Sequence, residues 1–215
     1  MIITWYGQAC FKLQSGNKAL VLDPFSKSIG LTPPSIQADI VFVTHEHSDH
    51  SNIKAIKGDY FLVNGPGEYK IGGVKAKGIT SFHDNEKGAK RGLNTLYLIE
   101  SEGIRILHCG DLGQERLEEG QLDEIGQVDI LMIPVGGFFT IDGHSAVGII
   151  KEIQPRIVIP MHYKVPKLTI AELQGVDIFL KEFGDPDSVP QEKLAIKQKD
   201  FVGEEEKTKV IVMKI

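Results

Sequence analysis

The chain has 215 residues, of which 41% are hydrophobic and 25% charged, a composition typical of a globular protein that buries a sizeable core. Its 29 acidic residues outnumber its 24 basic ones, giving a net charge of −5. This balance argues against a nucleic-acid-binding or anionic-membrane protein, because both need a basic surface. No apolar run approaches the roughly 18 residues of a transmembrane helix, so we expect no membrane span.

The cysteine count and the opening residues bear on the compartment. Cys10 and Cys109 are the two cysteines, too few for a disulfide framework. The opening MIITWYGQACF lacks the basic, apolar and small-residue regions of a secretion signal. We therefore expect a reduced protein of the cytoplasm.

Short apolar or β-branched runs dominate the first part of the chain and predict strands. In order, these strands cover residues 2–6, 10–13, 18–22, 39–43, 60–63, 69–71 and 74–79. A polar loop is expected over 26–37, and one or two helical turns over 51–57. The last two strands are separated by Gly72-Gly73 and so predict a hairpin.

The second part of the chain mixes strands with helices. Strands are expected over 95–100, 104–108, 129–135, 157–161, 194–197 and 210–215, with the first two and the last two paired as hairpins. Helices are expected in part of 114–126, over 145–153, where apolar residues recur with a helical period, and over 169–183, which ends before Gly184.

Strands outnumber helices and fall into two clusters, roughly residues 1–90 and 91–215. Two packed sheets with helices outside them are the natural architecture for such a pattern. Because no linker separates the clusters, we expect one domain over residues 1–215.

One segment, THEHSDH at residues 44–50, holds three of the seven histidines. Imidazoles two positions apart, directly after a strand, can point to the same side, and the next carboxylate and imidazole can turn toward a neighbouring point. Imidazole nitrogen and carboxylate oxygen are the donors that suit Zn²⁺ and related divalent ions. The segment therefore predicts a metal site that includes His45, His47, Asp49 and His50.

The pattern His-x-His-x-Asp-His resembles that of the metallo-β-lactamase superfamily, and the other motifs of that family occur in order over residues 23–162. They are an aspartate that ends an early strand, a histidine after a later strand, a carboxylate between the metals and a last histidine: Asp23, His83, Asp111 and His162. The resemblance implies an α/β fold, the four-layer αββα sandwich, with two metals in a cleft at one edge of the sheets.

Seven ligands are implied by this resemblance: His45, His47 and His83 for a first metal, Asp49, His50 and His162 for a second, and Asp111 as a bridge. Asp23 would hold the histidine loop through hydrogen bonds, as partners behind metal ligands do. Strand alternation places His108 on the other face from Asp111, in the core or behind the ligands, with substrate contact as the alternative. Cys109 is expected to be an inert core residue.

Such a site indicates hydrolysis. Metal ions lower the pKa of a bound water toward about 7, and a pair of ions stabilises the attacking and leaving oxygens. We expect Asp49 and Asp111 to act in catalysis, Asp49 by orienting the nucleophile or accepting its proton. The predicted cofactors are two divalent ions, with zinc favoured and manganese or iron as alternatives. The predicted reaction uses a metal-bound hydroxide on an ester, lactone or phosphoester bond of a small molecule.

Within the superfamily, the sequence is similar to the branch that includes L-ascorbate-6-phosphate lactonase and N-acyl-phosphatidylethanolamine phospholipase D. The similarity rests on WYGQACF at 5–11, HCGD at 108–111, GGFFT at 136–140 and PMHY at 160–163. Many members of this branch are known only as metal-dependent hydrolases. Glyoxalase II and lactamase types fit less well, because DNE rather than a glycine-rich turn follows His83.

Three alternatives stay open. A phosphodiesterase or nuclease is disfavoured by the lack of a basic cluster. A redox di-iron protein on the same fold usually carries glutamate at the position of His47. A metal-binding module without catalysis is the third. The sequence leaves the oligomeric state open.

Four further residues near the motifs are candidates for substrate contact. His144 precedes a predicted helix and either caps it at the surface or contacts substrate. Tyr163 directly follows a predicted ligand. Lys90 and Arg91 lie in the loop after His83, where they are either ordinary surface residues or hold a phosphate or carboxylate.

Overall fold

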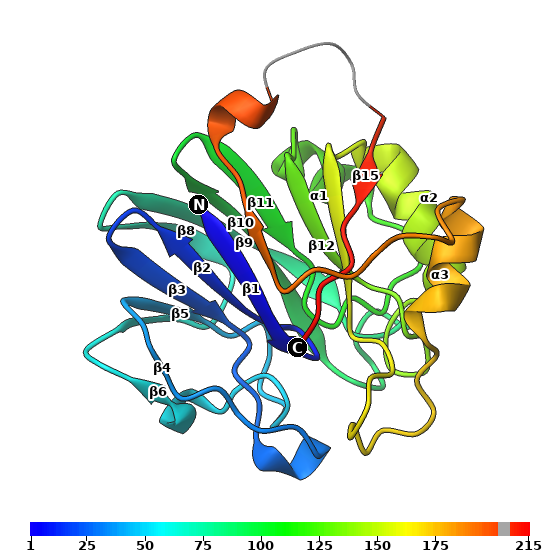
Figure 1. Cartoon of the computed structure of the whole chain (residues 1–215), viewed down its shortest axis with the longest axis horizontal. Coiled ribbons are helices and arrows are strands. Elements are labelled where there is room, and N and C mark those ends of the chain that lie inside the picture. Colours follow the sequence, from blue (N-terminus) through cyan, green and yellow to red (C-terminus); the bar gives the residue numbers. More distant parts are fainter. Residues whose placement is uncertain (202–206) are drawn as a thin grey trace.

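The computed structural model describes residues 1–201 and 207–215. Two β-sheets lie face to face, and the two longest α-helices, α2 (Gly143–Ile153) and α3 (Val176–Phe183), lie together on one side of the molecule (Figure 1). The first sheet has the strand order β14 (Lys193–Ala195), β1 (Ile2–Gly7), β2 (Cys10–Ser15), β3 (Lys18–Leu22), β5 (Ile40–Phe42) and β7 (Phe61–Val63). The second has the order β15 (Lys209–Val210), β13 (Ile157–Met161), β12 (Ile130–Pro134), β11 (Ile104–His108), β10 (Leu93–Ser101), β9 (Val74–Phe82) and β8 (Gly67–Ile71).

Smaller elements complete the described chain. A two-stranded sheet pairs β4 (Ile36–Gln37) with β6 (Ile56–Lys57). The α-helices are α1 (Glu119–Ile125), α2 (Gly143–Ile153) and α3 (Val176–Phe183), and the 3-10 turns are η1 (Lys27–Ile29), η2 (Ile53–Ala55) and η3 (Gln198–Phe201). No helix of the described residues is long and apolar enough to cross a membrane.

The main core fills the space between the two sheets. In β1, Ile3 and Trp5 are buried while their neighbours are more exposed, because successive strand residues point to opposite faces. Phe42 of the first sheet meets Tyr97 of the second with ring centroids 5.1 Å apart, and the Tyr97 hydroxyl donates to the Val43 carbonyl. Each such buried side chain contributes roughly 1.5–3 kcal/mol to folding. We retain the prediction of one domain, which this shared core supports.

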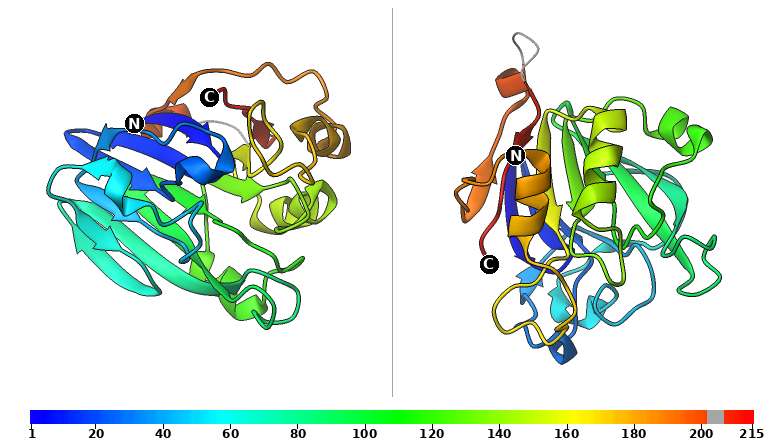
Figure 2. Two further views of the ribbon diagram at one scale, coloured as in Figure 1. Left: turned by 90° about the horizontal axis from the view of Figure 1, so that it is seen from below. Right: turned by 90° about the vertical axis from the view of Figure 1, so that its right-hand side faces the viewer.

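The outer faces of the two sheets are covered differently. Helices α2 and α3 pack on each other and α2 on β12, so they cover the second sheet (Figure 2). Asp142 caps α2 by accepting a hydrogen bond from the Ser145 N–H at 2.9 Å. A second apolar cluster covers the first sheet and includes Val21 and Val41 of the strands and Phe25 of the following loop. The predicted sandwich class is confirmed, and among the described residues this second cover is made of loops, 3-10 turns and the two-stranded sheet of β4 and β6.

Three expectations about elements are wrong in detail. The predicted helix over 169–183 begins only at Val176, because Leu168 and Leu173 pack against the first sheet instead. The last two strands form no hairpin: β14 joins β1 and β15 joins β13, in opposite sheets. The hairpin of β8 and β9 belongs to the second sheet. The chain therefore changes sheet between β7 and β8 rather than near residue 90.

Strand direction gathers the loops that carry the histidines and aspartates. Strands β11, β12 and β13 are parallel, and β9 runs in the same direction because β10 is antiparallel to both β9 and β11. Their carboxyl ends therefore meet at one edge of the second sheet. Strands β3 and β5 are also parallel, and the loops that follow them lie against that edge.

Candidate metal centre

Asp23 holds the loop that follows β5. It has a left-handed φ of +44° directly after β3, and its carboxylate is fully buried. The carboxylate accepts hydrogen bonds from the N–H and the hydroxyl of Thr44, both at 2.8 Å. Its Oδ2 also lies 2.9 Å from His50 Nδ1 and 3.2 Å from His108 Nε2. Burial raises the pKa of Asp23, but the charge of His50 and the bonds from both imidazoles hold that pKa well below its usual range.

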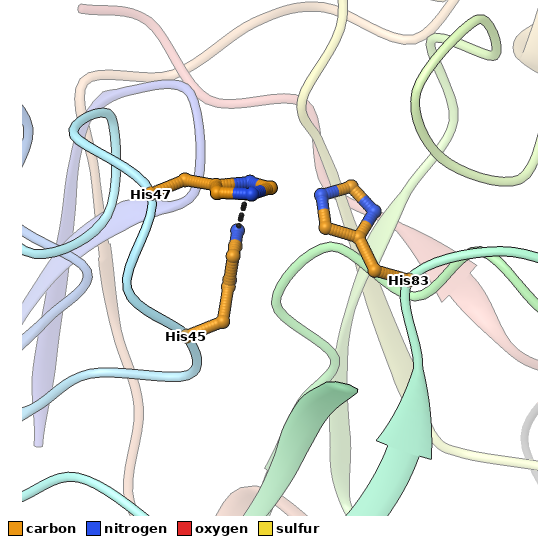
Figure 3. Close-up of side chains that lie close together, drawn as sticks. All are labelled: His45, His47 and His83. Carbon is orange, nitrogen blue, oxygen red and sulfur yellow. Dashed lines mark hydrogen bonds between the residues drawn. The ribbon is translucent and has the colours of Figure 1, made fainter. Parts of the chain in front are cut away.

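Three histidines converge at one side of this edge (Figure 3). His45 and His47 come from the loop after β5 and His83 from the end of β9. His45 Nε2 lies 3.0 Å from His47 Nδ1, and the ring of His83 is 4.8 Å from that of His45. One nitrogen of each ring lies within 4.8 Å of the others. His45 and His83 are buried, whereas His47 is exposed.

Four other residues form an adjacent group: Asp49, His50, Asp111 and His162. Their donor atoms also lie within 4.8 Å of one another. His50 Nε2 is 3.1 Å from Asp111 Oδ1 and 3.5 Å from Asp49 Oδ2. His162 follows β13 with a left-handed φ of +52°, and its Nε2 lies 3.3 Å from Asp111 Oδ2. The structure thus brings together, in two adjacent groups, all seven residues that the resemblance implies as ligands.

Asp111 lies between the two groups. Its Oδ2 is 3.3 Å from His83 Nε2 and 3.9 Å from His45 Nε2 of the first group, and it contacts His50 and His162 of the second. The backbone N–H of Asp111 donates to Asn94 Oδ1 at 3.0 Å. This single carboxylate therefore contacts members of both histidine groups.

The arrangement fits divalent metal ions. His50 Nε2 and Asp111 Oδ1 are buried and 3.1 Å apart, yet neither makes a hydrogen bond within the described part of the chain. Unpaired buried polar atoms are costly, and these two are aimed at the shared space between the donors. Nitrogen and oxygen donors in this number are the set that binds zinc and related ions.

Charges in the cluster are strongly coupled. Burial lowers the pKa of His50, but Asp111, Asp49 and Asp23 together raise it well above its usual value. For His45, burial and the neighbouring His50 charge lower the pKa to about 3. Burial raises the pKa of Asp111, but His162 and His50 hold it well below the usual range. The carboxylates are therefore ionised and His45 is neutral at neutral pH, as metal ligands must be, whereas His50 is held protonated by the carboxylates around it and would release that proton to a bound metal ion.

Two residues of this centre escaped the sequence analysis. Gln8, fully buried with a φ of +52°, places Nε2 3.0 Å from Asp49 Oδ2 and 2.7 Å from His162 Nε2. Asn94 of β10 donates to the Cys109 carbonyl and accepts from the Asp111 N–H. A single neutral amide forms no sequence pattern that would predict such a contact. The one indication was that Gln8 lies in the opening motif, WYGQACF, on which the family resemblance partly rests.

The other residues that the sequence suggested for this site make contacts away from the donor atoms of the predicted ligands, or lie behind those ligands. His144 is exposed on α2, and its Nδ1 pairs with Glu182 of α3 at 2.9 Å. Tyr163 is buried against Trp5, with its hydroxyl 3.4 Å from the Met213 carbonyl, and lines an apolar pocket of about 560 Å³. His108 contacts Asp23, as expected, and Cys109 is a buried free thiol. Within the described residues, neither His144 nor Tyr163 contacts a donor atom of the seven predicted ligands.

A two-sheet sandwich with a histidine and aspartate cluster at one edge defines the class of metallo-β-lactamase-type metallohydrolases. The chain belongs to this superfamily, since the model of the beta-lactamase superfamily domain matches residues 2–162. Its relatives and its fold identify it as a metal-dependent hydrolase.

Individual relatives and solved structures resemble this chain to different degrees. A UPF0173 metal-dependent hydrolase of Thermoplasma acidophilum is 29% identical over 195 residues, which cover 79% of this chain and 86% of that protein. A crystal structure from Thermotoga maritima, described as a candidate zinc-dependent hydrolase of the superfamily, is 36% identical with a TM-score of 0.79, covering 99% of this chain and 97% of that one. A diiron β-hydroxylase of Streptomyces venezuelae shares the fold alone, at 11% identity and a TM-score of 0.65, over 91% of this chain and 54% of its own.

Proposed function

We propose that this hydrolase binds two divalent ions, with zinc favoured, and cleaves an ester, lactone or phosphoester bond of a small molecule. The observation that carries the proposal is the position of Asp111 between a three-histidine group and an Asp-His-His group. His45, His47 and His83 would hold one ion, Asp49, His50 and His162 the other, and Asp111 both. Two ions bound there would lower the pKa of a coordinated water and so supply a nucleophile at neutral pH.

Asp49 is the residue of the cluster best placed to handle the proton of that reaction. Its side chain is 20% exposed, whereas that of Asp111 is 2% exposed. Burial raises the pKa of Asp49, but the nearby charge of His50 lowers it below the usual range, so the carboxylate is ionised and can accept a proton. The amide of Gln8 fixes Asp49 Oδ2 at 3.0 Å. Behind the donors, Asp23 keeps His50 oriented, which leaves its Nε2 facing Asp111.

Metal counting tests the two-ion proposal. Protein purified without added metal, then supplied with zinc or manganese and desalted, is expected to hold about two ions per chain by elemental analysis. His47→Ala and His162→Ala remove one donor from each group, and each is expected to lose about one ion. His144→Ala is the matched control, because that ring is exposed and its one ion pair within the described residues is with Glu182. One ion or none in the wild type, or losses in the control equal to those in the variants, would overturn the proposal.

A substrate panel tests the reaction. Lactones, thioesters and phosphodiesters are assayed with the loaded wild type and with Asp49→Asn. We expect turnover in at least one class and a drop in kcat of about 10²-fold or more in the variant, the usual contribution of a positioned proton acceptor. Equal kcat values for wild type and Asp49→Asn, at equal metal content, would remove Asp49 from the proposed chemistry.

A further inference from the structure

Two loops flank Asp111 at the edge of the second sheet. The loop over residues 84–92 follows His83 and returns to it, because the His83 N–H donates to the Gly92 carbonyl at 3.1 Å. The loop over residues 135–142 follows β12 and is tied to the neighbour of Asp111, since the Ile141 N–H donates to the Leu112 carbonyl at 2.9 Å. In the sheet order β12-β11-β10-β9, the end of β11 that leads to Asp111 lies between them.

The Arg91 side chain joins these two loops. Its Nη2 lies 3.4 Å from the Phe138 carbonyl, and its guanidinium carbon lies 5.3 Å from the centre of the Phe139 ring. The two phenylalanine rings are packed edge to face, with centroids 4.5 Å apart. The Arg91 side chain therefore connects the loop that follows His83 with the loop that is bonded to the neighbour of Asp111.

The loop that carries Arg91 has a fixed shape. The Asp84 carboxylate accepts backbone hydrogen bonds from Glu86, Gly88, Lys90 and Arg91 at 2.8–2.9 Å. The position of Arg91 is thus set before any ligand arrives, which lowers the entropy cost of binding.

Arg91 and its neighbour differ in how their charges are balanced. Lys90 forms an ion pair with Glu86. Arg91 makes no ion pair with a carboxylate of residues 1–201 or 207–215, and is held by one carbonyl and one aromatic face. A guanidinium has five N–H donors, and stacking on a ring leaves the in-plane donors free. The arrangement fits an oxyanion, which a guanidinium binds with two parallel hydrogen bonds.

We propose that Arg91 is an anion-binding subsite of the metal centre, which takes a carboxylate or phosphate group on the substrate, away from the bond that is cleaved. Phe138 is 55% exposed and offers an apolar surface to the body of the same substrate. The proposal rests on the proposed function and narrows it: the small molecule carries an oxyanion as well as the hydrolysed bond.

Matched substrates test this subsite. The 4-nitrophenyl half-ester of succinate carries a free carboxylate, its methyl ester lacks only that charge, and the 4-nitrophenyl ester of 3-phosphonopropionate carries a phosphonate instead. We expect the loaded wild type to hydrolyse both charged esters with a higher kcat/KM than the neutral methyl ester. Whichever charged ester has the higher kcat/KM shows whether the subsite takes a carboxylate or a phosphate-like group. Arg91→Gln is expected to lower kcat/KM for the preferred charged ester about 10- to 100-fold, mainly through KM, and to leave the neutral ester unchanged.

Two further variants sharpen the result. Arg91→Lys keeps the charge but loses the paired donors, and is expected to fall between wild type and Arg91→Gln. Lys90→Gln removes the adjacent cation, which is already paired with Glu86, and is expected to behave as the wild type. Equal loss on charged and neutral esters in Arg91→Gln, no loss at all, or an equal loss in Lys90→Gln would overturn the subsite.

A binding measurement separates this proposal from the hydrolase reaction. N-phenylsuccinamate resembles the half-ester but has an amide bond, and its binding to the loaded protein is measured by calorimetry. We expect binding about tenfold weaker in Arg91→Gln, and no such difference for the methyl ester of the same amide. Arg91-dependent binding without ester hydrolysis would refute the reaction and keep the subsite. Ester hydrolysis with binding that ignores Arg91 would do the reverse.

Discussion

Asp23 Oδ2 lies 2.9 Å from His50 Nδ1, and both side chains are completely buried. Because one nitrogen of this imidazole is taken by the carboxylate, the other faces Asp111 at 3.1 Å. Asp23 also fixes Thr44, the residue before His45, through two hydrogen bonds. One carboxylate from β3 therefore sets the orientation of both parts of the histidine loop.

This relationship predicts the effect of Asp23→Asn. The amide keeps the shape of the side chain but loses the charge and presents an N–H to its donors. We expect unfolding free energy to fall by about 3 kcal/mol, as for other broken buried ion pairs, and metal affinity to fall roughly 10- to 100-fold. Urea unfolding and competition with a chelator measure the two effects. Asp39→Asn, at a carboxylate that also binds a backbone N–H but is only partly buried and lies outside the metal centre, is the control for affinity and should leave it unchanged.

Gln8 gives a prediction that separates the two metal groups. Its amide contacts Asp49 and His162, both of the second group. Gln8→Ala is expected to weaken binding of one ion about tenfold, because outer partners of ligands contribute at this level, and to leave the other ion unaffected. A two-step metal titration followed by calorimetry shows the split. Gln14→Ala is the matched control, since within the part of the chain that the structure describes that amide donates to the Gly16 and Lys18 carbonyls alone. Equal weakening of both ions in Gln8→Ala would contradict the assignment.

The candidate site was more predictable than the elements around it. Histidine and aspartate spacing reflects metal chemistry directly, and all seven predicted ligands lie in two adjacent groups. Gln8 and Asn94 act through neutral amides whose partners are at least 41 and 13 residues away, respectively, so no local sequence pattern identifies them. His144 was a candidate from its position alone, and its pairing with Glu182 depends on how α2 meets α3.

The wrong element predictions share one cause. Apolar residues over 169–173 have a helical period, but Leu168 and Leu173 pack on the first sheet while α3 lies over the second. The final segments, 194–197 and 210–215, are apolar enough to predict two paired strands, yet each joins the edge of a different sheet. In both places tertiary contacts outweighed local preference.

Gly110 is expected to accept no side chain. Its φ is +51°, and an added Cβ would lie 2.5 Å from Asn94 Oδ1 and 2.7 Å from Thr44 Cβ. Gly110→Ala should therefore lose roughly 1–3 kcal/mol of unfolding free energy and weaken metal binding, because Asp111 is the next residue. Gly120→Ala in α1, where nothing lies within 4 Å, should instead gain about 0.5–1 kcal/mol. Thermal unfolding of both variants checks the opposite signs, and a neutral Gly110→Ala would show that the turn can relax.

Asp39 carries a pH dependence that is independent of the metal centre. The hydrogen bond from the Ala19 N–H, and then the one from Lys18 Nζ, both at 2.8 Å, lower the pKa of Asp39 from its ordinary 3.8. A carboxyl whose pKa is lower in the folded state stabilises the fold above its ordinary pKa and loses this effect as the pH falls through the folded value. Urea unfolding at pH 7 should show a difference of about 0.5 kcal/mol between wild type and Asp39→Asn, since the pair is exposed.

That difference should shrink as the pH falls below about 4. Lys18→Gln tests the cause, because it removes the ion pair and keeps the Ala19 bond. We expect Lys18→Gln to retain most of the pH dependence of the wild type, as the backbone bond is the larger of the two influences. If Lys18→Gln instead flattens the profile as fully as Asp39→Asn does, the ion pair rather than the backbone hydrogen bond stabilises the junction of β3 and β5.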